Sequence, residues 1–171
     1  MIPELKYGLL GGLATCLWIA LEYALGLHAE HARIGAYTGL LSNLIPVVML
    51  FLLLKKKRTA VYDGRLSLGA GIWSALLAGL VAALIVYSGL TVYTHLINPT
   101  WVDQALELKV AAWRAETLAE TEIQSRIVQF RHAYTPSGLL WSTMVGTPLL
   151  AGIMAVPLTL FVRTLPRPEN L

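Results

Sequence analysis

Residues 68 to 97 read LGAGIWSALLAGLVAALIVYSGLTVYTHLI, thirty positions without one Asp, Glu, Lys or Arg. A helix of about 20 residues already crosses a hydrocarbon layer of about 30 Å, so this stretch is long enough to span a membrane. Its apolar run is unbroken rather than alternating, which favours a helix over a strand of a membrane barrel. The stretch therefore predicts a transmembrane helix.

Three other stretches of the chain have the same character. Hydrophobic residues make up 56% of the 171 positions and charged residues only 13%, a composition that is unusual for a water-soluble domain of this length. We therefore expect an all-α polytopic membrane protein, folded as a single domain over residues 1–171. The predicted transmembrane helices lie at about 7–27, 37–54, 68–97 and 139–162.

The distribution of Lys and Arg predicts how the helices are oriented. The loop between the first two spans contains only Arg33, whereas the connection after the second span is strongly basic. Short loops rich in Lys and Arg stay in the cytoplasm. Both termini are then cytoplasmic, and residues 98–135 form an extracytoplasmic insertion. The basic residues of the connection are Lys55, Lys56, Lys57, Arg58 and Arg65. Because this run directly follows a span, we interpret it as a topology anchor and expect no nucleic-acid partner.

The insertion at 98–135 has the pattern of a helical hairpin. Its two halves carry apolar residues at helical spacing, namely Val102, Leu106, Val110 and Trp113, then Ile123, Ile127, Phe130 and Tyr134. The polar stretch TLAETEIQ separates them and predicts a break near Thr117 to Thr121. The insertion is expected to pack on its own domain, on the outer membrane surface or on a partner.

Small residues recur every four positions along three of the predicted spans. Lipid gives no hydrophobic drive between helices, so small residues that allow close backbone approach decide the packing. Such seams pair helices within one chain or between two copies, and both remain open. The seam residues are Gly8 and Gly12 in the first span, Gly71, Ala75, Gly79 and Ala83 in the third, and Gly138 and Gly146 in the fourth.

Several segments together resemble a known family of membrane proteins. They are KYGLLGGL at 6–13, LLLKKKR at 52–58, DGRLSLGAGIWSALLAGL at 63–80 and HLINPTW at 95–101. With these segments the chain resembles, over nearly its whole length, the bacterial proteins grouped as DUF4199, domain of unknown function 4199. The resemblance implies a bacterial inner-membrane protein of four helices whose role is unassigned, and it transfers no active-site residue.

Glu22 lies inside the first span, in the stretch LWIALEYALGLHAEH at 17–31. With a rise of about 1.5 Å per residue, its Cα is about 7 to 8 Å inside the outer end of the helix. An ionisable group at that depth costs about 2 to 3 kcal/mol, so it should face protein or water rather than lipid. The other spans supply polar residues at comparable depth, and these complete a predicted polar layer: Asn43, Tyr87, Thr91, His95 and Ser142.

Two interpretations of this layer stay open. In one, the layer lines a small polar cavity open to the non-cytoplasmic side, and Glu22 binds a proton or a cation. In the other, a protonated Glu22 bonds to Asn43 or a tyrosine and only sets the rotation of its helix. His28 and His31 are expected in an interfacial loop, and no metal site is predicted, because zinc normally needs a third protein ligand.

The sequence lacks a Gly-rich phosphate loop, a nucleophile elbow and paired catalytic carboxylates. We therefore expect neither enzymatic activity nor a cofactor. The leading hypothesis is a structural or accessory subunit of a membrane assembly, with a homo-oligomer or another membrane protein as partner. The alternative is a small oligomeric transporter or channel that uses the polar layer around Glu22.

Overall fold

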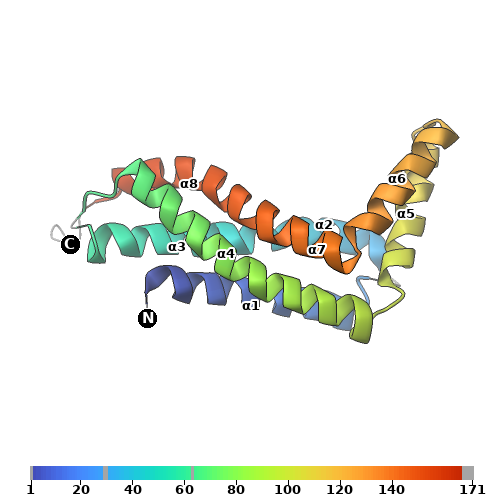
Figure 1. Ribbon diagram of the computed structural model, residues 1–171, viewed down its shortest axis with the longest axis horizontal. Coiled ribbons are helices and arrows are strands. Elements are labelled where there is room, and N and C mark those ends of the chain that lie inside the picture. The colour runs from blue at the N-terminus through green and yellow to red at the C-terminus, as the bar shows by residue number, and fades with distance from the viewer. Residues whose placement is uncertain (1, 29–30, 63, 167–171) are drawn as a thin grey trace.

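The computed structural model describes residues 2–28, 31–62 and 64–166, and every regular element in these ranges is helical. Figure 1 shows a long bundle with one hairpin projecting from an end. The all-α prediction is confirmed. In chain order the elements are α1 Pro3–Ala24, α2 Ala32–Ser42, α3 Leu44–Ala60, α4 Leu68–Val92, the π-helix η1 Tyr93–Ile97, α5 Trp101–Ala115, α6 Glu120–Ala133, α7 Pro136–Trp141, the π-helix η2 Ser142–Gly146 and α8 Thr147–Thr164.

Among the described residues, four helical segments are long and apolar enough to cross a membrane, as predicted. They are Pro3–Ala24, Tyr37–Ala60, Leu68–Ile97 and Pro136–Thr164. The first segment stops earlier than expected, because Gly26 takes a left-handed conformation (φ +69°) that ends helices. The second runs through the basic residues to Ala60, since positive side chains are favourable at a helix C-terminus.

Helix α4 is the central element, packed between α1 and α8. Glycines allow this close packing. A Cβ added to Gly8 would lie 2.6 Å from the Ala78 carbonyl oxygen, and one on Gly12 would lie 2.7 Å from the Ile85 Cβ. On the opposite face of α4, a Cβ on Gly79 would lie 2.9 Å from the Pro148 Cα. Gly71 likewise lies against Thr159 of α8. The seam residues Ala75 and Ala83 are fully buried.

The fourth span departs from the predicted seam. Gly138 lies against the carbonyls of His132 and Ala133, in the sharp turn between α6 and α7, rather than against α4. A Cβ on Gly146 would meet no heavy atom within 4 Å. The close approach in this span is instead at Gly152, whose added Cβ would lie 2.9 Å from Leu76 Cδ2. The spacing of small residues does not reveal which of them face a neighbouring helix, because helix rotation depends on the whole packing.

Two spans are interrupted near prolines. Pro46 cannot donate to the carbonyl of Ser42, and the second span breaks between α2 and α3 at Asn43. Pro148 cannot donate to the carbonyl of Met144, and the π-helix η2 precedes it. Both interruptions bring polar side chains into the membrane-spanning part of the bundle.

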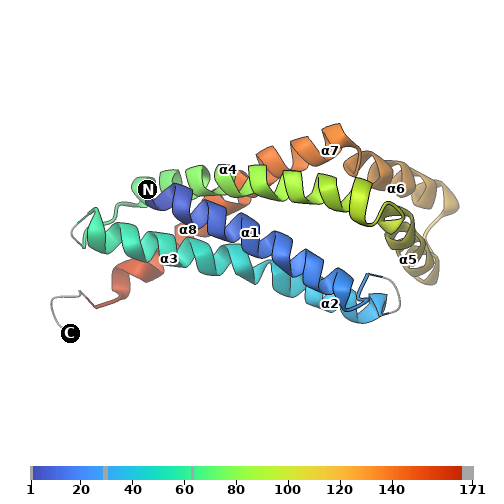
Figure 2. The same cartoon turned by 90° about the horizontal axis from the view of Figure 1, so that it is seen from below.

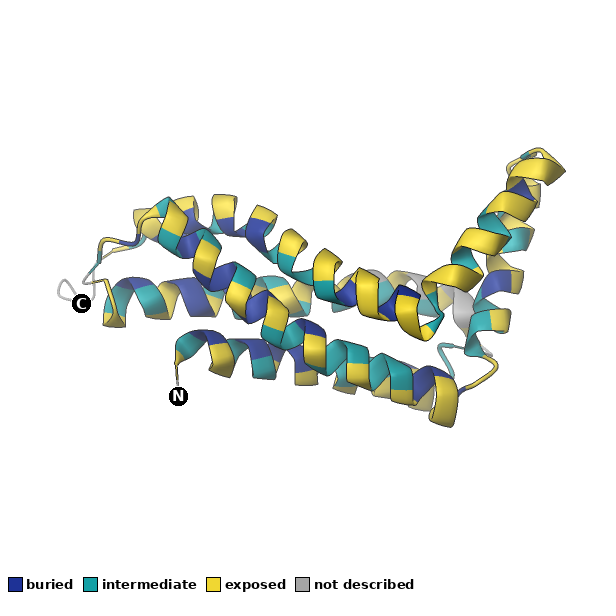
Figure 3. Ribbon diagram, in the orientation of Figure 1, coloured by how far each residue is buried: buried dark blue, intermediate teal, exposed yellow. Residues whose placement is uncertain are grey.

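Helices α5 and α6 form the hairpin that projects from the bundle (Figure 1). They are joined by residues 116–119, where Thr117 has a φ of +56°, so the break falls where the sequence predicts it. Leu106 and Ile123 form the buried centre of the hairpin, while most of its surface is exposed (Figure 3). An Arg131–Asp103 ion pair of 2.9 Å joins its two helices.

The two ends of the bundle differ. The start of α1, the connection from α3 to α4 and the end of α8 all lie at one end, opposite the hairpin (Figures 1 and 2). The apolar core of the bundle is concentrated towards this end, and its fully buried side chains include Leu53, Leu54, Leu66 and Val162. We call this the terminal end, and the other the hairpin end.

Candidate functional site

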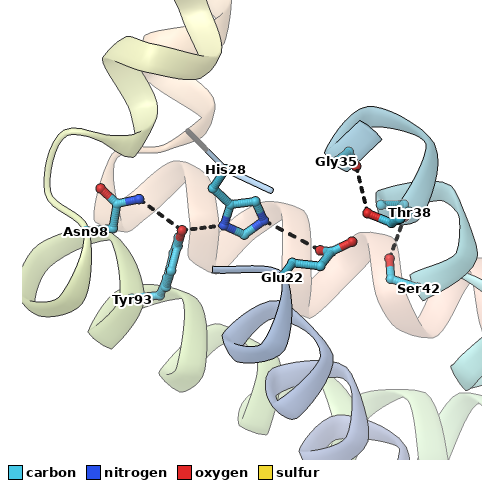
Figure 4. A network of polar contacts seen from close by, with 8 residues as sticks. Glu22, His28, Gly35, Thr38, Ser42, Tyr93 and Asn98 are labelled. Carbon is cyan, nitrogen blue, oxygen red and sulfur yellow. Dashed lines mark hydrogen bonds and ion pairs between the residues drawn. The ribbon is translucent and has the colours of Figure 1, made fainter. Parts of the chain in front are cut away.

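Glu22 belongs to a chain of polar contacts at the hairpin end, shown in Figure 4. Asn98 Nδ2 donates to the Tyr93 hydroxyl over 3.0 Å, and this hydroxyl shares a hydrogen bond of 2.5 Å with His28 Nδ1. His28 Nε2 lies 3.5 Å from Glu22 Oε2. If the Tyr93 hydroxyl donates to Nδ1, the imidazole carries its hydrogen on Nε2 and presents it to the carboxylate. We call these four residues the Glu22 network.

The turn after α1 places His28 beside Glu22. Gly26 accepts the left-handed conformation at no steric cost, so the chain reverses directly after the helix. The Leu27 amide then donates to the Glu22 carbonyl over 2.9 Å, which holds the turn against the last turn of α1. The histidine thereby folds back over a carboxylate that precedes it by six positions.

Aromatic rings connect the Glu22 network to the hairpin. Tyr93 packs edge to face on Trp101, with ring centroids 6.0 Å apart, and Trp101 packs on Tyr134 at 5.0 Å. His28 also lies against Trp101, at 6.1 Å. Burial raises the pKa of Tyr134 above its ordinary value, so its hydroxyl stays neutral at physiological pH. The hairpin is thus held on the bundle through the residues that surround Glu22.

The structure divides the predicted polar layer. In the described part of the chain, the Glu22 carboxylate contacts His28 through Oε2, and Glu22 Oε1 is buried without a hydrogen-bond partner. Thr91 Oγ1 is likewise buried and unpartnered, His95 is exposed and hydrogen-bonds through Nδ1 to the Thr91 carbonyl, and Tyr87 is half-buried. Asn43 and Ser142 line a separate cavity. The similar depth that the sequence predicts for these polar side chains does not make them neighbours, because helix rotation and the turn after α1 decide which side chains meet.

That cavity lies between α1, α3, α4 and α8 and has a volume of about 440 Å³. Most of its lining is apolar, and Glu22 is not among the described residues that line it. Gly8, Gly79 and Gly146 are among the lining residues, and at Gly146 an added Cβ would meet only open space. This cavity therefore brings together Asn43 and Ser142 of the predicted polar layer without Glu22.

A second charged cluster, at the terminal end, was not predicted from the sequence. Lys57 Nζ lies 2.6 Å from Glu4 Oε1, and Ser74 Oγ donates to the same oxygen over 3.0 Å. The side chains of Lys57 and Glu4 are only 12% and 8% exposed. The sequence does contain a signal for this pair. Glu4 stands at the start of the first span, and the basic run stands at the end of the second, so the two lie at the same end of antiparallel helices. By itself, the basic run predicts only a topology anchor.

Two arginines tie the end of α8 to the connection between α3 and α4. Arg58 is buried and donates to the carbonyls of Val162 and Leu165, each over 2.8 Å, and to that of Gly64 over 3.3 Å. Arg163 donates to the Leu66 carbonyl over 2.8 Å. The bonds to Val162 and Leu165 satisfy carbonyls at the end of α8, and those to Gly64 and Leu66 satisfy carbonyls of the connection.

Metal-ligating side chains do not gather in this structure. Within 2–28, 31–62 and 64–166, no group of three or more His, Cys, Asp or Glu residues is placed to hold a metal ion.

Comparison with known proteins bears on the whole chain rather than on one site. Neither the curated proteins nor the solved structures contain a match. A family model does match, over residues 6–164, and it is described as "Protein of unknown function (DUF4199)". The match covers nearly the whole bundle and the hairpin, so this chain of apolar, membrane-spanning helices belongs to the DUF4199 family.

Proposed function

We propose that this protein is a non-enzymatic structural or accessory subunit of an assembly in the bacterial inner membrane, with both termini in the cytoplasm. The observation that carries the proposal is the α5–α6 hairpin, which lies outside the bundle and is closed by its own core and ion pairs. Such a hairpin presents a preformed surface, which lowers the entropic cost of binding a partner.

The bundle supports the same proposal. Its buried charges are paired with each other or bonded to carbonyls, as in the Glu4–Lys57 pair and the Arg58 bonds. These contacts at the terminal end favour one fixed arrangement of the spans. The basic connection lies at the end opposite the hairpin, which supports a cytoplasmic terminal end and an extracytoplasmic hairpin.

The surface of the hairpin suggests where a partner, another integral membrane protein, would bind. Leu108 of α5 and Val128 of α6 are 50% and 68% exposed. Lys109, which adjoins Leu108, has its Nζ 5.7 Å from the ring centroid of Phe130, two positions after Val128. This contact shows that Leu108 and Val128 lie at similar heights along the hairpin. Exposed aliphatic side chains on an otherwise charged hairpin are suited to the apolar centre of an interface.

We expect the double variant Leu108→Ser, Val128→Ser to lose the assembly while still inserting into the membrane. The measurement is cross-linking in intact cells with a membrane-impermeant amine-reactive reagent, followed by sizing of the complex. The matched control, Ala111→Ser with Gln129→Ser, changes two exposed hairpin positions without removing an aliphatic side chain and should keep the cross-linked species. An assembly of unchanged size in the Leu108, Val128 variant would contradict the proposal, as would the absence of any assembly in the wild type.

A second candidate function is a small transporter or channel. The observation that favours it is Glu22, which is 4% exposed and keeps one carboxylate oxygen without a hydrogen-bond partner. A buried carboxylate with a free oxygen is suited to binding a proton or a cation.

The experiment for this candidate is ion flux in proteoliposomes. We expect the wild type and Glu22→Gln to give the same flux as protein-free liposomes under a pH or sodium gradient, because Glu22 does not line the cavity. Glu107→Gln, which changes an exposed carboxylate, is the matched control. A wild-type flux that persists in Glu107→Gln and disappears in Glu22→Gln would establish the transporter instead.

A further inference from the structure

The cavity between α1, α3, α4 and α8 has two chemically different sections. One section is lined by apolar side chains that include Leu50, Leu53 and Met154. The other carries hydroxyl and amide groups, those of Ser42, Asn43, Ser142 and Thr147. Ligand pockets in proteins have volumes of about 300 to 1,000 Å³ and are mostly apolar with a few placed polar groups, and this cavity of about 440 Å³ has both properties.

The polar section coincides with the two interrupted helices. Ser42 and Asn43 stand where the second span breaks between α2 and α3, and Ser142 begins the π-helix η2. Breaks of this kind are tolerated at membrane depth where the chain lines a cavity or is buried in protein, and π-helical turns are frequent at functional sites. Two spans therefore lose regular structure at residues that line the cavity.

Charge sets a limit on the occupant. Among the described lining residues, none is Asp, Glu, Lys, Arg or His. An ionised head would find no counter-charge among these residues, so a neutral head is favoured. The apolar section in turn disfavours a small polar solute, because most of its side chains offer no hydrogen bonds and the Tyr7 hydroxyl is an exception.

The hydroxyl groups indicate what the head of the ligand carries. Ser42 Oγ donates to the Gly39 carbonyl over 2.6 Å, and Ser142 Oγ donates to the Leu139 carbonyl over 3.2 Å. Each serine has thus used its one hydrogen and keeps its oxygen as an acceptor. A head with hydroxyl donors satisfies these oxygens.

The length of the cavity indicates the rest of the ligand. Asn43 and Leu53 line its two sections and are ten positions apart along the second span, or about 15 Å at a rise of 1.5 Å per residue. This is half of a hydrocarbon core of about 30 Å, the depth that one lipid chain occupies in a leaflet. A volume of about 440 Å³ spread over this length leaves a narrow cross-section, which fits one acyl chain better than two side by side.

We propose that this cavity binds a neutral, single-chain amphiphile with a hydroxyl-bearing head, of the chemical class of a monoacylglycerol. The chain lies along Leu50, Leu53 and Met154, and the head reaches Ser42 and Ser142. This site shares no residue with the hairpin, so its test is independent of the test of the accessory function proposed above.

The test is photolabelling of the full-length protein in detergent micelles with a diazirine-bearing monoacylglycerol. We expect the label on the walls of the cavity, in α3 or α8, and a fall in labelling of about tenfold or more in Gly146→Phe. Gly146 lines the cavity, and a Cβ there meets no heavy atom within 4 Å, so the ring fills the space without displacing the backbone. Gly69→Phe is the matched control, because a Cβ at Gly69 also meets no atom within 4 Å and Gly69 is not among the lining residues.

A second variant distinguishes loss of the cavity from misfolding of Gly146→Phe. Gly11→Leu fills the cavity from α1, where an added Cβ would lie 3.6 Å from Met49, and it should reduce labelling as Gly146→Phe does. An excess of unlabelled monoacylglycerol should compete with the label, whereas a lysophosphatidic acid of the same chain length should not. Equal labelling of both filled variants and the Gly69 control would overturn the site. Equal competition by the anionic lipid would overturn the neutral head.

Discussion

Replacing Lys57 with methionine should lower the free energy of unfolding by about 3 to 5 kcal/mol, because it leaves the Glu4 carboxylate buried without its counter-charge. Lys57 Nζ is 2.6 Å from Glu4 Oε1 and both side chains are largely buried. Lys56 is the matched control, since it adjoins Lys57 in sequence, carries the same charge and is exposed. Lys56→Met should change the stability by less than about 0.5 kcal/mol. Reversible denaturation in detergent measures both values.

A double variant separates the pair from the loss of a single charge. In Glu4→Gln, Lys57→Met neither partner is ionised, so most of the lost stability should return. Lys56→Met and Lys57→Met remove the same charge from the basic connection and so affect topology alike. Equal stability of these two single variants would show that the Glu4–Lys57 contact contributes nothing to folding.

Replacing Arg58 with leucine should cost about 3 to 6 kcal/mol of unfolding free energy, at about 1.5 to 3 kcal/mol for each of its two short bonds from a charged donor. The guanidinium donates to the carbonyls of Val162 and Leu165, each over 2.8 Å, and joins α3 to the end of α8. Arg58→Lys should recover only part of the loss, because an ammonium group lacks the planar fork that reaches two carbonyls.

The control for Arg58 is Arg65→Leu in the same connection, where the side chain is exposed and an equal charge is removed. Arg65→Leu should leave the stability within about 0.5 kcal/mol of the wild type. Full stability in Arg58→Lys would show that charge alone, rather than the two placed hydrogen bonds, accounts for the role of Arg58.

Much of the fold could be predicted from the sequence because the bilayer sets the length of each spanning helix. The stretch 68–97 was expected as one span, and α4 with η1 covers Leu68–Ile97. The break near Thr117 was visible as a polar stretch between two apolar stripes, and α5 and α6 end and begin there. These features depend on local composition, so neighbouring segments do not alter them.

The candidate site was predictable only in part. Glu22 was singled out correctly as a buried acid, but its neighbours His28, Tyr93 and Asn98 were not foreseen. His28 reaches Glu22 only through the turn at Gly26, and the spacing of residues along a helix cannot describe such a turn. The Glu4–Lys57 pair was missed for a similar reason, since its partners lie on helices far apart in sequence.

The sequence by itself determined which segments form helices long and apolar enough to cross a membrane and where the hairpin is inserted between them, because the rise per residue and the hydrophobic thickness are constant. Only the tertiary structure decided which polar groups meet. Helix rotation, the course of the turns and the helix breaks near Pro46 and Pro148 follow from packing among all four spans. As a result, Asn43 and Ser142 line the cavity between the spans, whereas Glu22 is not among the described residues that line it.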